Sequence, residues 1–392
     1  MAQLGLAFTL LVGSGLLLRS FWELQKVDPG YDSENVLSMR ATVNSQNSSM
    51  SPEEQQEFFL TIRERISALP GVLSTALTDN SPMQFQQAMF HGVRPEGAEE
   101  SDGTMLPQAQ PHTVDVGYFE TVGVPLLAGR TFTAADDDSA PLVALVNESL
   151  AENAWPGQDP VSKRCAPCSM MGDCDNPMFT VIGVVRDVHE VGIETRPPAQ
   201  IYGAMRQGNR VQNLVVRTAG DPLAMGRQLR EIVAELNPTI PVSNIVTLDQ
   251  RRRNALSPRR LTVVLLSIFA GVAFLVSLAG IAGVIAFGVS QRTHEIGIRM
   301  ALGAQRDTVM KVVLTRGLKL ITLGLMVGIL GSLGLAKVIS GLVWGIPTVD
   351  PVTFVGMAAL LVVLALLACY VPGRRATRID PVVAFRASCG QG

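Results

Sequence analysis

The sequence predicts an α+β membrane protein, in which four transmembrane helices carry a large mixed α/β domain inserted between the first helix and the second. Two observations predict this class. The chain of 392 residues is 47% hydrophobic and only 17% charged, whereas an ordinary soluble domain carries about 25% charged residues. Its long apolar stretches also lie towards the two ends, and the middle has the mixed composition of a soluble domain. Together these observations favour a membrane protein with one large domain outside the bilayer.

Four segments are long and apolar enough to cross a bilayer, which takes about 20 mostly apolar residues. They are residues 1–22, 261–289, 317–343 and 352–371. A cleaved signal peptide is the alternative for the first segment, but it lacks a basic start and an Ala-x-Ala cleavage site, so we expect a membrane anchor. The fourth segment follows Asp350-Pro351, a pair that is typical of a helix N-cap and first turn.

Basic residues orient these helices, because short loops that stay in the cytoplasm carry an excess of lysine and arginine. The loop 290–316 and the tail 372–392 are rich in basic residues, and the link 344–352 has none. We therefore expect the loop and the tail in the cytoplasm, and the link and residues 23–260 outside. Several arginines lie at those ends of the first and second helices that we expect outside, Arg19 among them. Charges on a long translocated domain have little weight in this rule.

The middle domain, residues 23–260, alternates helix and strand patterns. A cap, a first-turn proline and acidic residues start a helix at Ser51-Pro52-Glu53-Glu54, and the apolar residues that follow recur at helical spacing. Residues 84–111 are polar with little periodicity, and we expect a loop there. The whole pattern predicts a mixed α/β domain of two subdomains. The other expected elements are strands at 72–77, 142–146, 179–185 and 214–216 and helices at 147–155 and 221–236.

Three cysteines cluster in this domain, at Cys165, Cys168 and Cys174. In an oxidising compartment, one disulfide and one free thiol are the expected outcome. Two alternatives stay open. One is a metal site, which would need a fourth ligand, and the other is a Cys-x-x-Cys redox centre.

The sequence carries no motif for catalysis. It has no Gly-x-x-x-x-Gly-Lys-Ser/Thr phosphate loop and no His-Glu-x-x-His zinc motif, and no Gly-x-Ser-x-Gly nucleophile elbow. Its net charge of −2 leaves no electrostatic footprint for nucleic acid. We therefore expect a protein that is not an enzyme, binds no nucleic acid and has no cofactor of its own.

The cytoplasmic loop holds the most informative stretch, Gln291-Arg-Thr-His-Glu-Ile-Gly-Ile-Arg-Met-Ala-Leu-Gly-Ala304. Its charges pair at helical spacing, Arg292 with Glu295 and Glu295 with Arg299. Gly303 suits the C-terminal cap of such a helix. A charged helix that ends in a glycine at the membrane surface can be held and levered by another protein. The alternative is an ordinary charged interfacial loop.

Long motifs follow one another in order through most of the chain: Leu11–Phe21, Val27–Tyr31, Val181–Val188, Pro198–Tyr202, Arg292–Ala304 and Pro372–Arg386. Together they resemble the FtsX-like, MacB-type permeases of ABC transporters. The first two motifs are similar to the acidobacterial duplicated orphan permease branch, and the next two fit its periplasmic core domain. The last two resemble the cytoplasmic loop of the family and its C-terminal signature.

The resemblance implies a topology, a location and a site. It implies four transmembrane helices in the bacterial inner membrane, with the large domain in the periplasm between the first helix and the second. It also implies a separate ABC ATPase subunit that binds ATP and docks on the cytoplasmic loop. The residues in or beside this contact would be Arg292, Glu295, Gly297, Arg299 and Gly303.

Further partners follow from the same resemblance, namely a second permease unit, as a homodimer or a pseudo-dimer, and a periplasmic adaptor. The chain departs from the family pattern in three ways. Members of the orphan branch often carry two units, whereas this chain has one unit that resembles the second, and its first helix begins at Met1. The insert Cys165–Cys174 is not part of the family pattern either.

The sequence leaves three candidate functions for the protein. The leading one is the permease subunit of an ABC-type efflux or mechanotransmission complex, which couples a separate ATPase to movement of the periplasmic domain. The alternative is an FtsX-like membrane regulator of a periplasmic hydrolase or another partner, without export of a cargo. The third is a redox or metal module built on the cysteines.

Overall fold

The fold comes from a computed structural model of the chain, which forms two compact units. One unit comprises Met1–Lys26 and Pro258–Gly392, and the other comprises Val27–Ser257. This division lies close to the expected domain 23–260. The residues that the structure describes are 2–43, 49–84, 90–97, 106–168, 174, 176–190, 192–208, 210–290, 306–347 and 349–376.

The first unit is helical. Within the part of the chain that the structure describes, 4 helices are long and apolar enough to cross a membrane by length and composition. This number agrees with the 4 segments expected from the sequence. After the third of them the chain forms a short 3-10 helix, Ser340–Leu342. The four helices are α1 (Ala2–Gln25), α7 (Ser257–Ser290), α9 (Arg306–Val338) and α10 (Pro351–Ala376).

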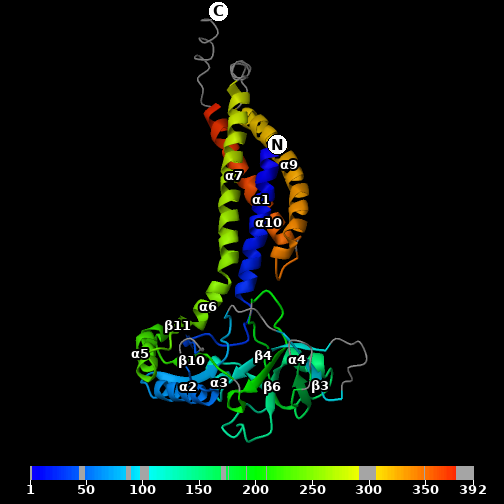
Figure 1. Ribbon diagram of the computed structural model, residues 1–392. Helices are drawn as coiled ribbons and strands as arrows, with labels where there is room; N and C mark the ends of the chain where they lie inside the picture. The colour runs from blue at the N-terminus through cyan, green and yellow to red at the C-terminus, as the bar shows by residue number, and fades with distance from the viewer. Residues whose placement is uncertain are drawn as a thin grey trace, which may run out of the picture. The chain divides into compact units, whose positions relative to one another are not determined.

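Helix α1 is the centre of the helical unit and lies between α7 and α9 (Figure 1). Of its apolar window, 61% is buried inside the unit, against 22% or less for the other three helices. The unit packs around Phe8, Val12 and Leu16 of α1. The remaining helices leave large apolar side chains exposed, such as Phe269 and Leu330. Helices that are apolar on every side are typical of a bilayer environment.

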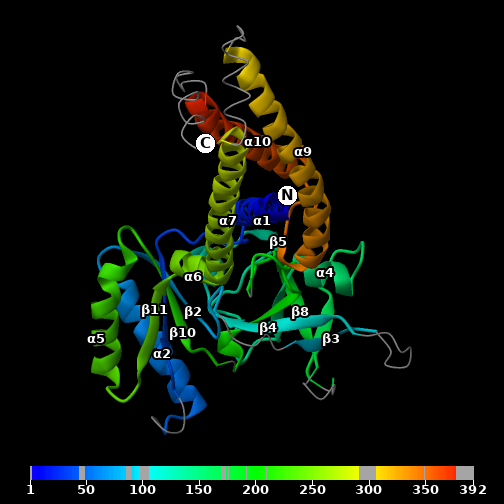
Figure 2. The same ribbon diagram turned by 90° about the horizontal axis from the view of Figure 1, so that it is seen from above.

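The unit Val27–Ser257 has two halves, and the first is a four-stranded antiparallel sheet in the order β11-β1-β10-β2. Helices α2 and α5 cover one face of this sheet (Figure 2). Their apolar sides, with Ile62 and Leu229 at the centre, pack on buried residues of the strands. The elements are β1 (Val36–Ala41), α2 (Pro52–Ser67), β2 (Val72–Thr78), β10 (Asn213–Thr218), α5 (Gly226–Leu236) and β11 (Val242–Thr247).

The second half is a closed ring of strands in the order β4-β3-β7-β8-β6-β9, because β9 also pairs with β4. A separate apolar core draws residues from every strand of this ring and from α4. One pair of residues, Thr78 and Val114, joins the ring to the sheet of the first half. The elements are β3 (His91–Pro95), β4 (Gln108–Val114), α3 (Tyr118–Val122), β5 (Leu126–Gly129), β6 (Val143–Asn147), α4 (Glu148–Ala154), β7 (Arg164–Pro167), β8 (Phe179–Val185) and β9 (Gln200–Ala204).

The expected helix after Ser51 is confirmed, because Ser51 and Glu54 form a reciprocal capping box at the start of α2. The strand expected at 179–185 is also confirmed, as β8. The expectation of a loop over 84–111 is wrong, since its described part includes β3 and the start of β4. Strand β4 buries polar side chains, so it lacks the apolar alternation by which strands are recognised in a sequence.

Candidate functional site

The expected ATPase contact falls on residues that the structure leaves undescribed. Arg292, Glu295, Gly297, Arg299 and Gly303 all lie within the undescribed range 291–305. The described neighbours of this range are the last residues of α7 and the first residues of α9. The structure therefore describes how α7 and α9, the helices on either side of this range, contact the rest of their unit.

Glycines on α9 allow this helix to pack directly on α1. A Cβ atom at Gly324 would lie 2.5 Å from Cδ2 of Leu4, and one at Gly328 would lie 2.8 Å from Cβ of Phe8. The hydroxyl of Thr9 also donates a hydrogen bond of 3.3 Å to the carbonyl oxygen of Gly328. Small residues at a helix crossing bring the two backbones close and increase the van der Waals contact. Helix α9 and helix α1 are thus tightly joined.

Hydroxyl groups join α1 to α7. The side-chain oxygens of Ser14 and Ser267 lie 2.9 Å apart, and the hydroxyl of Ser277 donates to the carbonyl oxygen of Gln3 over 2.9 Å. Hydrogen bonds of this kind hold apolar helices together where no water competes for them. Helix α1 therefore contacts, through specific groups, both helices that flank the expected ATPase contact.

The link between α9 and α10 is bound to α1 as well. The hydroxyl of Ser20 donates to the carbonyl oxygen of Trp344 over 2.9 Å and accepts from its backbone N–H over 2.7 Å. Arg19 forms an ion pair with Asp350. The carboxylate of Asp350 also accepts from the backbone N–H of Thr353 over 2.9 Å and so caps α10, as the sequence predicted.

This ion pair was missed in the sequence, where Arg19 counted as a charge against the expected orientation. Its partner is Asp350, which lies in the link 344–352 that we expect outside the membrane. The signal was present, because Asp350 is the only charged residue of that link.

We expect Asp350→Ala to lower the stability of the helical unit by more than the usual helix cap, which is worth about 0.5–2 kcal/mol, because Arg19 also loses its partner. Thermal unfolding of the full chain in detergent measures this change. Asp350→Asn is the matched control, since its amide oxygen keeps the cap and it lacks only the charge. Equal unfolding temperatures for wild type and Asp350→Ala would contradict the described contacts.

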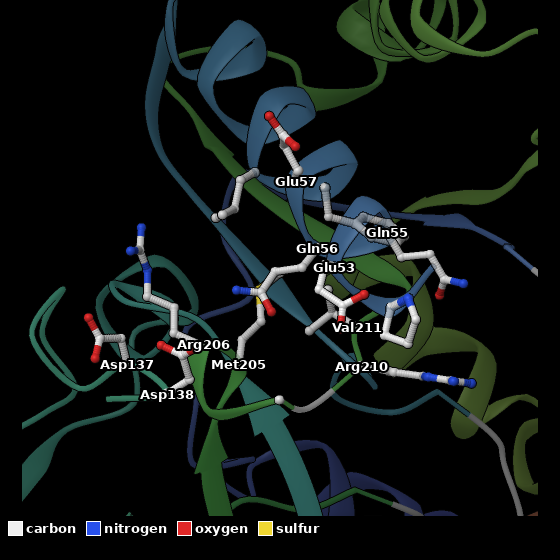
Figure 3. Close-up of a pocket in the computed structure, with 14 residues that line it drawn as sticks. Glu53, Gln55, Gln56, Glu57, Asp137, Asp138, Met205, Arg206, Arg210 and Val211 are labelled. Carbon is white, nitrogen blue, oxygen red and sulfur yellow. The ribbon is translucent and has the colours of Figure 1, made fainter. Parts of the chain in front are cut away.

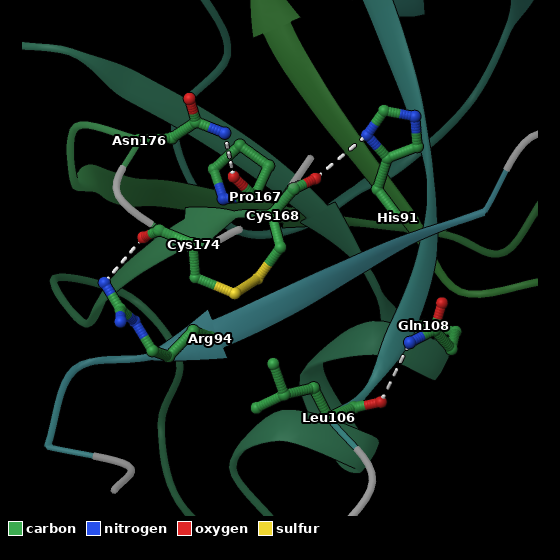
Figure 4. Close-up of a disulfide and its surroundings, with 8 residues drawn as sticks. All are labelled: His91, Arg94, Leu106, Gln108, Pro167, Cys168, Cys174 and Asn176. Atoms are coloured by element: carbon green, nitrogen blue, oxygen red, sulfur yellow. Dashed lines mark hydrogen bonds between the residues drawn. A yellow bond between two sulfur atoms is a disulfide. The ribbon is translucent and has the colours of Figure 1, made fainter. Parts of the chain in front are cut away.

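Two of the three clustered cysteines are joined in the structure (Figure 4). Cys168 and Cys174 form a disulfide, and Cys165 is a buried free thiol. The carbonyl oxygen of Cys168 lies 3.1 Å from Nδ1 of His91, and Nη2 of Arg94 donates to the carbonyl oxygen of Cys174 over 2.6 Å. The disulfide and its neighbours thus hold the end of β7 against β3.

This geometry gives one disulfide and one free thiol, the first of the three arrangements considered for the cysteines. The two residues of the Cys-x-x-Cys motif are not bonded to each other, because Cys168 bonds to Cys174. Burial raises the pKa of Cys165 to about 12, so its thiol stays protonated and unreactive near neutral pH. Among the described residues, no group of three or more His, Cys, Asp and Glu side chains could hold a metal ion.

A cleft runs beside α2 in the unit Val27–Ser257 (Figure 3). Its volume is about 410 Å³, and a neighbouring hollow of about 680 Å³ shares Leu60 and Arg206 with it. Its walls mix a few apolar side chains with charges of both signs, unlike the mostly apolar pockets that hold drug-sized ligands. No motif in the sequence pointed to this cleft. Its charged lining residues are Glu53, Glu57, Asp137, Asp138, Arg206 and Arg210.

Two family profiles match the chain in succession. The MacB-like periplasmic core domain matches residues 22–243, which is more than half of the chain. The C-terminal domain of FtsX-like permeases matches residues 267–381. The first match covers most of the unit Val27–Ser257, and the second covers most of α7, α9 and α10.

Similar proteins include transporters and permeases. The macrolide export ATP-binding/permease protein MacB of Mannheimia succiniciproducens is 25% identical over 280 residues, 68% of this chain and 42% of its own length. The uncharacterized ABC transporter permease YknZ of Bacillus subtilis is 21% identical over 326 residues, 82% of this chain and 78% of its own length. The chain thus spans less than half of MacB and most of YknZ.

A solved structure is similar as well, the periplasmic region of MacB from Actinobacillus actinomycetemcomitans. It is 14% identical, with a TM-score of 0.38, and the likeness covers 57% of this chain and 94% of that one. The membership itself follows from the two sequence profiles and their order along the chain. The chain belongs to the MacB-like and FtsX-like family of ABC transporter permeases, which are membrane proteins.

Proposed function

We propose that this chain is the permease subunit of an ABC-type efflux or mechanotransmission complex. A separate ATPase binds ATP, docks on the loop 290–316 in the cytoplasm and shifts the transmembrane helices. The shift moves the unit Val27–Ser257, which lies in the periplasm between the first and second transmembrane helices. The single observation that carries the proposal is the match of two permease domain profiles, in order, over most of the chain.

The contacts of the helical unit support a role in transmission. Helix α9, which starts directly after the expected ATPase contact, packs on α1 through Gly324 and Gly328. Helix α7, which ends directly before that contact, is bonded to α1 through Ser14 and Ser267. A push on the loop would therefore reach α1 along two routes. The chain continues from α1 into the unit Val27–Ser257.

The same proposal includes the surroundings of the chain. The location is the bacterial inner membrane, and the partners are the ATPase, a second permease unit and a periplasmic adaptor. The chain itself is not an enzyme and needs no cofactor, since ATP is bound by the ATPase. An efflux role is supported by the names of relatives, such as MacB and the pyoverdine export protein PvdT of Pseudomonas syringae, which is 25% identical over 288 residues.

The test is co-purification of the full chain with an ABC ATPase from membranes of its native host. We expect Glu295→Lys and Gly303→Pro to lower the recovered ATPase at least tenfold, a loss of about 1.4 kcal/mol or more in binding. The first reverses a charge in the contact, and the second puts a proline where a helix cap is expected. Glu231→Lys, on the exposed side of α5, is the matched control and should leave the recovery unchanged.

Unchanged recovery in both loop variants would show that the ATPase does not use this loop. If the ATPase is lost as expected, but deletion of the gene alters the activity of a periplasmic hydrolase and no export, the chain acts as the FtsX-like regulator instead. An absence of any ABC ATPase in the purified wild-type complex would contradict both forms of the proposal.

A further inference from the structure

Ionisable side chains gather inside the unit Val27–Ser257, where its two halves meet. Glu190 follows β8, and His112 lies on β4. Arg251 lies on α6 (Leu248–Ala255), and Tyr31 precedes β1. The exposed fraction of each of these residues is between 3% and 7%. Charged residues are almost never this deeply buried unless they are paired.

The pairing of these groups is incomplete within the described residues. Nδ1 of His112 lies 3.8 Å from Oδ1 of Asp79, but its Nε2 has no hydrogen-bond partner. Oε2 of Glu190 and the hydroxyl of Tyr31 are buried without a partner as well. A buried carboxylate without hydrogen bonds is costly, so it binds a proton more readily than it would in water.

Burial raises the pKa of Glu190 to about 7, and the charge of Asp79 adds to the rise, while the charges of His112 and Arg251 oppose it. Burial lowers the pKa of His112, but its contact with Asp79 and the charge of Glu190 outweigh burial and raise it. Each residue thus alters the proton affinity of the other, and the two titrate as a pair.

The groups around this pair come from several elements of the unit. Asp79 directly follows β2 and is partly exposed, as are Asp187, Arg40, Asp249 and Arg252, whereas Arg251 and the tyrosines are buried. The tyrosines carry no charge near neutral pH, so Asp79 and Arg251 are the charges that act on the pair. The titratable and charged groups in and around this cluster are Asp79, Tyr118, Asp187, Tyr202, Arg40, Arg251, Tyr31, Asp249 and Arg252.

The cluster also adjoins both ends of the unit's chain. Tyr31 ends the segment Val27–Tyr31, through which the chain enters the unit, and α6 is the last helix before the chain leaves it. Nη2 of Arg252 donates to the carbonyl oxygen of Val27 over 3.3 Å, so the two ends are bonded to each other. The N–H of His189, next to Glu190, donates to the carbonyl oxygen of Pro29 over 3.0 Å.

We propose that Glu190 and His112 form a proton-operated latch, which holds the segment Val27–Tyr31 and helix α6 on the unit when the pair is protonated and loosens them when it loses its proton. The reason is Oε2 of the Glu190 carboxylate, which is buried and has no hydrogen-bond partner among the described residues while the latch is closed. Opening lets water reach it. This latch is a property of the unit itself and goes beyond the coupling proposed above.

The direction of the pH effect follows from linkage. The closed latch binds the proton of Glu190 with a pKa of about 7, whereas a solvated glutamate carboxyl has a pKa of 4.5. The closed state is therefore fully stabilised below the lower value and loses stability as the pH rises through the higher one. The difference between these two pKa values corresponds to about a 300-fold change in the opening equilibrium. His112 acts in the same direction, because its pKa is raised as well.

Hydrogen exchange of the full chain in detergent, followed by mass spectrometry, tests the latch. After correction for the intrinsic pH dependence of exchange, we expect protection of residues 27–31 and of α6 to fall roughly 70-fold between about pH 5 and pH 8. In Glu190→Gln, which mimics the protonated side chain, protection of both segments should stay high and vary little with pH. Glu152→Gln, at an exposed position of α4, is the matched control and should behave as wild type.

A second variant keeps the test decisive if Glu190→Gln fails to fold. In His112→Gln the lost positive charge should raise the pKa of Glu190, so protection should fall at a higher pH than in wild type. A purely structural role of His112 would instead lower protection equally at every pH. A wild-type profile without pH dependence, or the same slope in wild type and Glu190→Gln, would overturn the latch.

Discussion

Replacing Gly30 with alanine is expected to destabilise the unit Val27–Ser257 by about 2–5 kcal/mol. The backbone of Gly30 has φ +85°, a conformation that costs an L-residue about 1–2 kcal/mol. An added Cβ would also collide with the carbonyl oxygen of Asp187, and overpacking of this kind costs about 1–3 kcal/mol. Because domains are stable by only about 5–15 kcal/mol, this is a large fraction of the total.

Gly71→Ala separates the cost of the backbone conformation from the cost of the steric overlap. Gly71 has nearly the same backbone, with φ +87°, but a Cβ there would meet nothing within 4 Å. We expect it to lose only the conformational part, about 1–2 kcal/mol. Thermal and denaturant unfolding of the full chain measure both variants. If Gly30→Ala and Gly71→Ala lose the same stability, the close approach of Gly30 to Asp187 does not hold.

Replacing Gly328 with leucine is expected to break the contact between α9 and α1. The first atom of the new side chain would already lie 2.8 Å from Phe8 and 3.1 Å from the carbonyl oxygen of Gly5. A backbone atom cannot rotate away, so the helices must separate, at a cost of about 1–3 kcal/mol or more. The measurement is the unfolding temperature of the full chain in detergent.

Gly334→Leu is the matched control for this change, because Gly334 lies on the same helix in open space. It exchanges the same residue types on α9 and should leave the unfolding temperature almost unchanged. The two variants also probe function. If α9 transmits force through α1, Gly328→Leu should uncouple ATP hydrolysis from transport, whereas Gly334→Leu should not. Equal behaviour of the two would contradict the assigned contact.

Much of the architecture could be read from composition and periodicity. The four long apolar helices follow directly from apolar stretches that are too long for ordinary core helices. Helix α2 follows from its capping box at Ser51 and Glu54, and β8 follows from a run of apolar and β-branched residues. These signals are local, since each depends on neighbouring residues alone. The family resemblance was carried by longer motifs and is shown by the two profile matches.

The features that the sequence did not predict depend on residues that lie far apart in the chain. Strand β4 contains Gln110 and His112, which are polar and yet buried, because β4 is the strand of the ring that joins it to the sheet and pairs with β2, β3 and β9. Its strand character arises from partners that are distant in the sequence. The ion pair of Arg19 with Asp350 joins residues 331 positions apart and was missed for the same reason.

The sequence by itself determined the class of the protein and its four apolar helices, because these depend on the order and kind of neighbouring residues. The tertiary structure alone decided that Cys168 bonds to Cys174 and that α9 packs on α1 through its glycines. It alone also brought Glu190 and His112 together with both ends of the unit. Those features depend on which distant segments share a buried space, and burial sets the protonation of a carboxyl group that looks ordinary in the sequence.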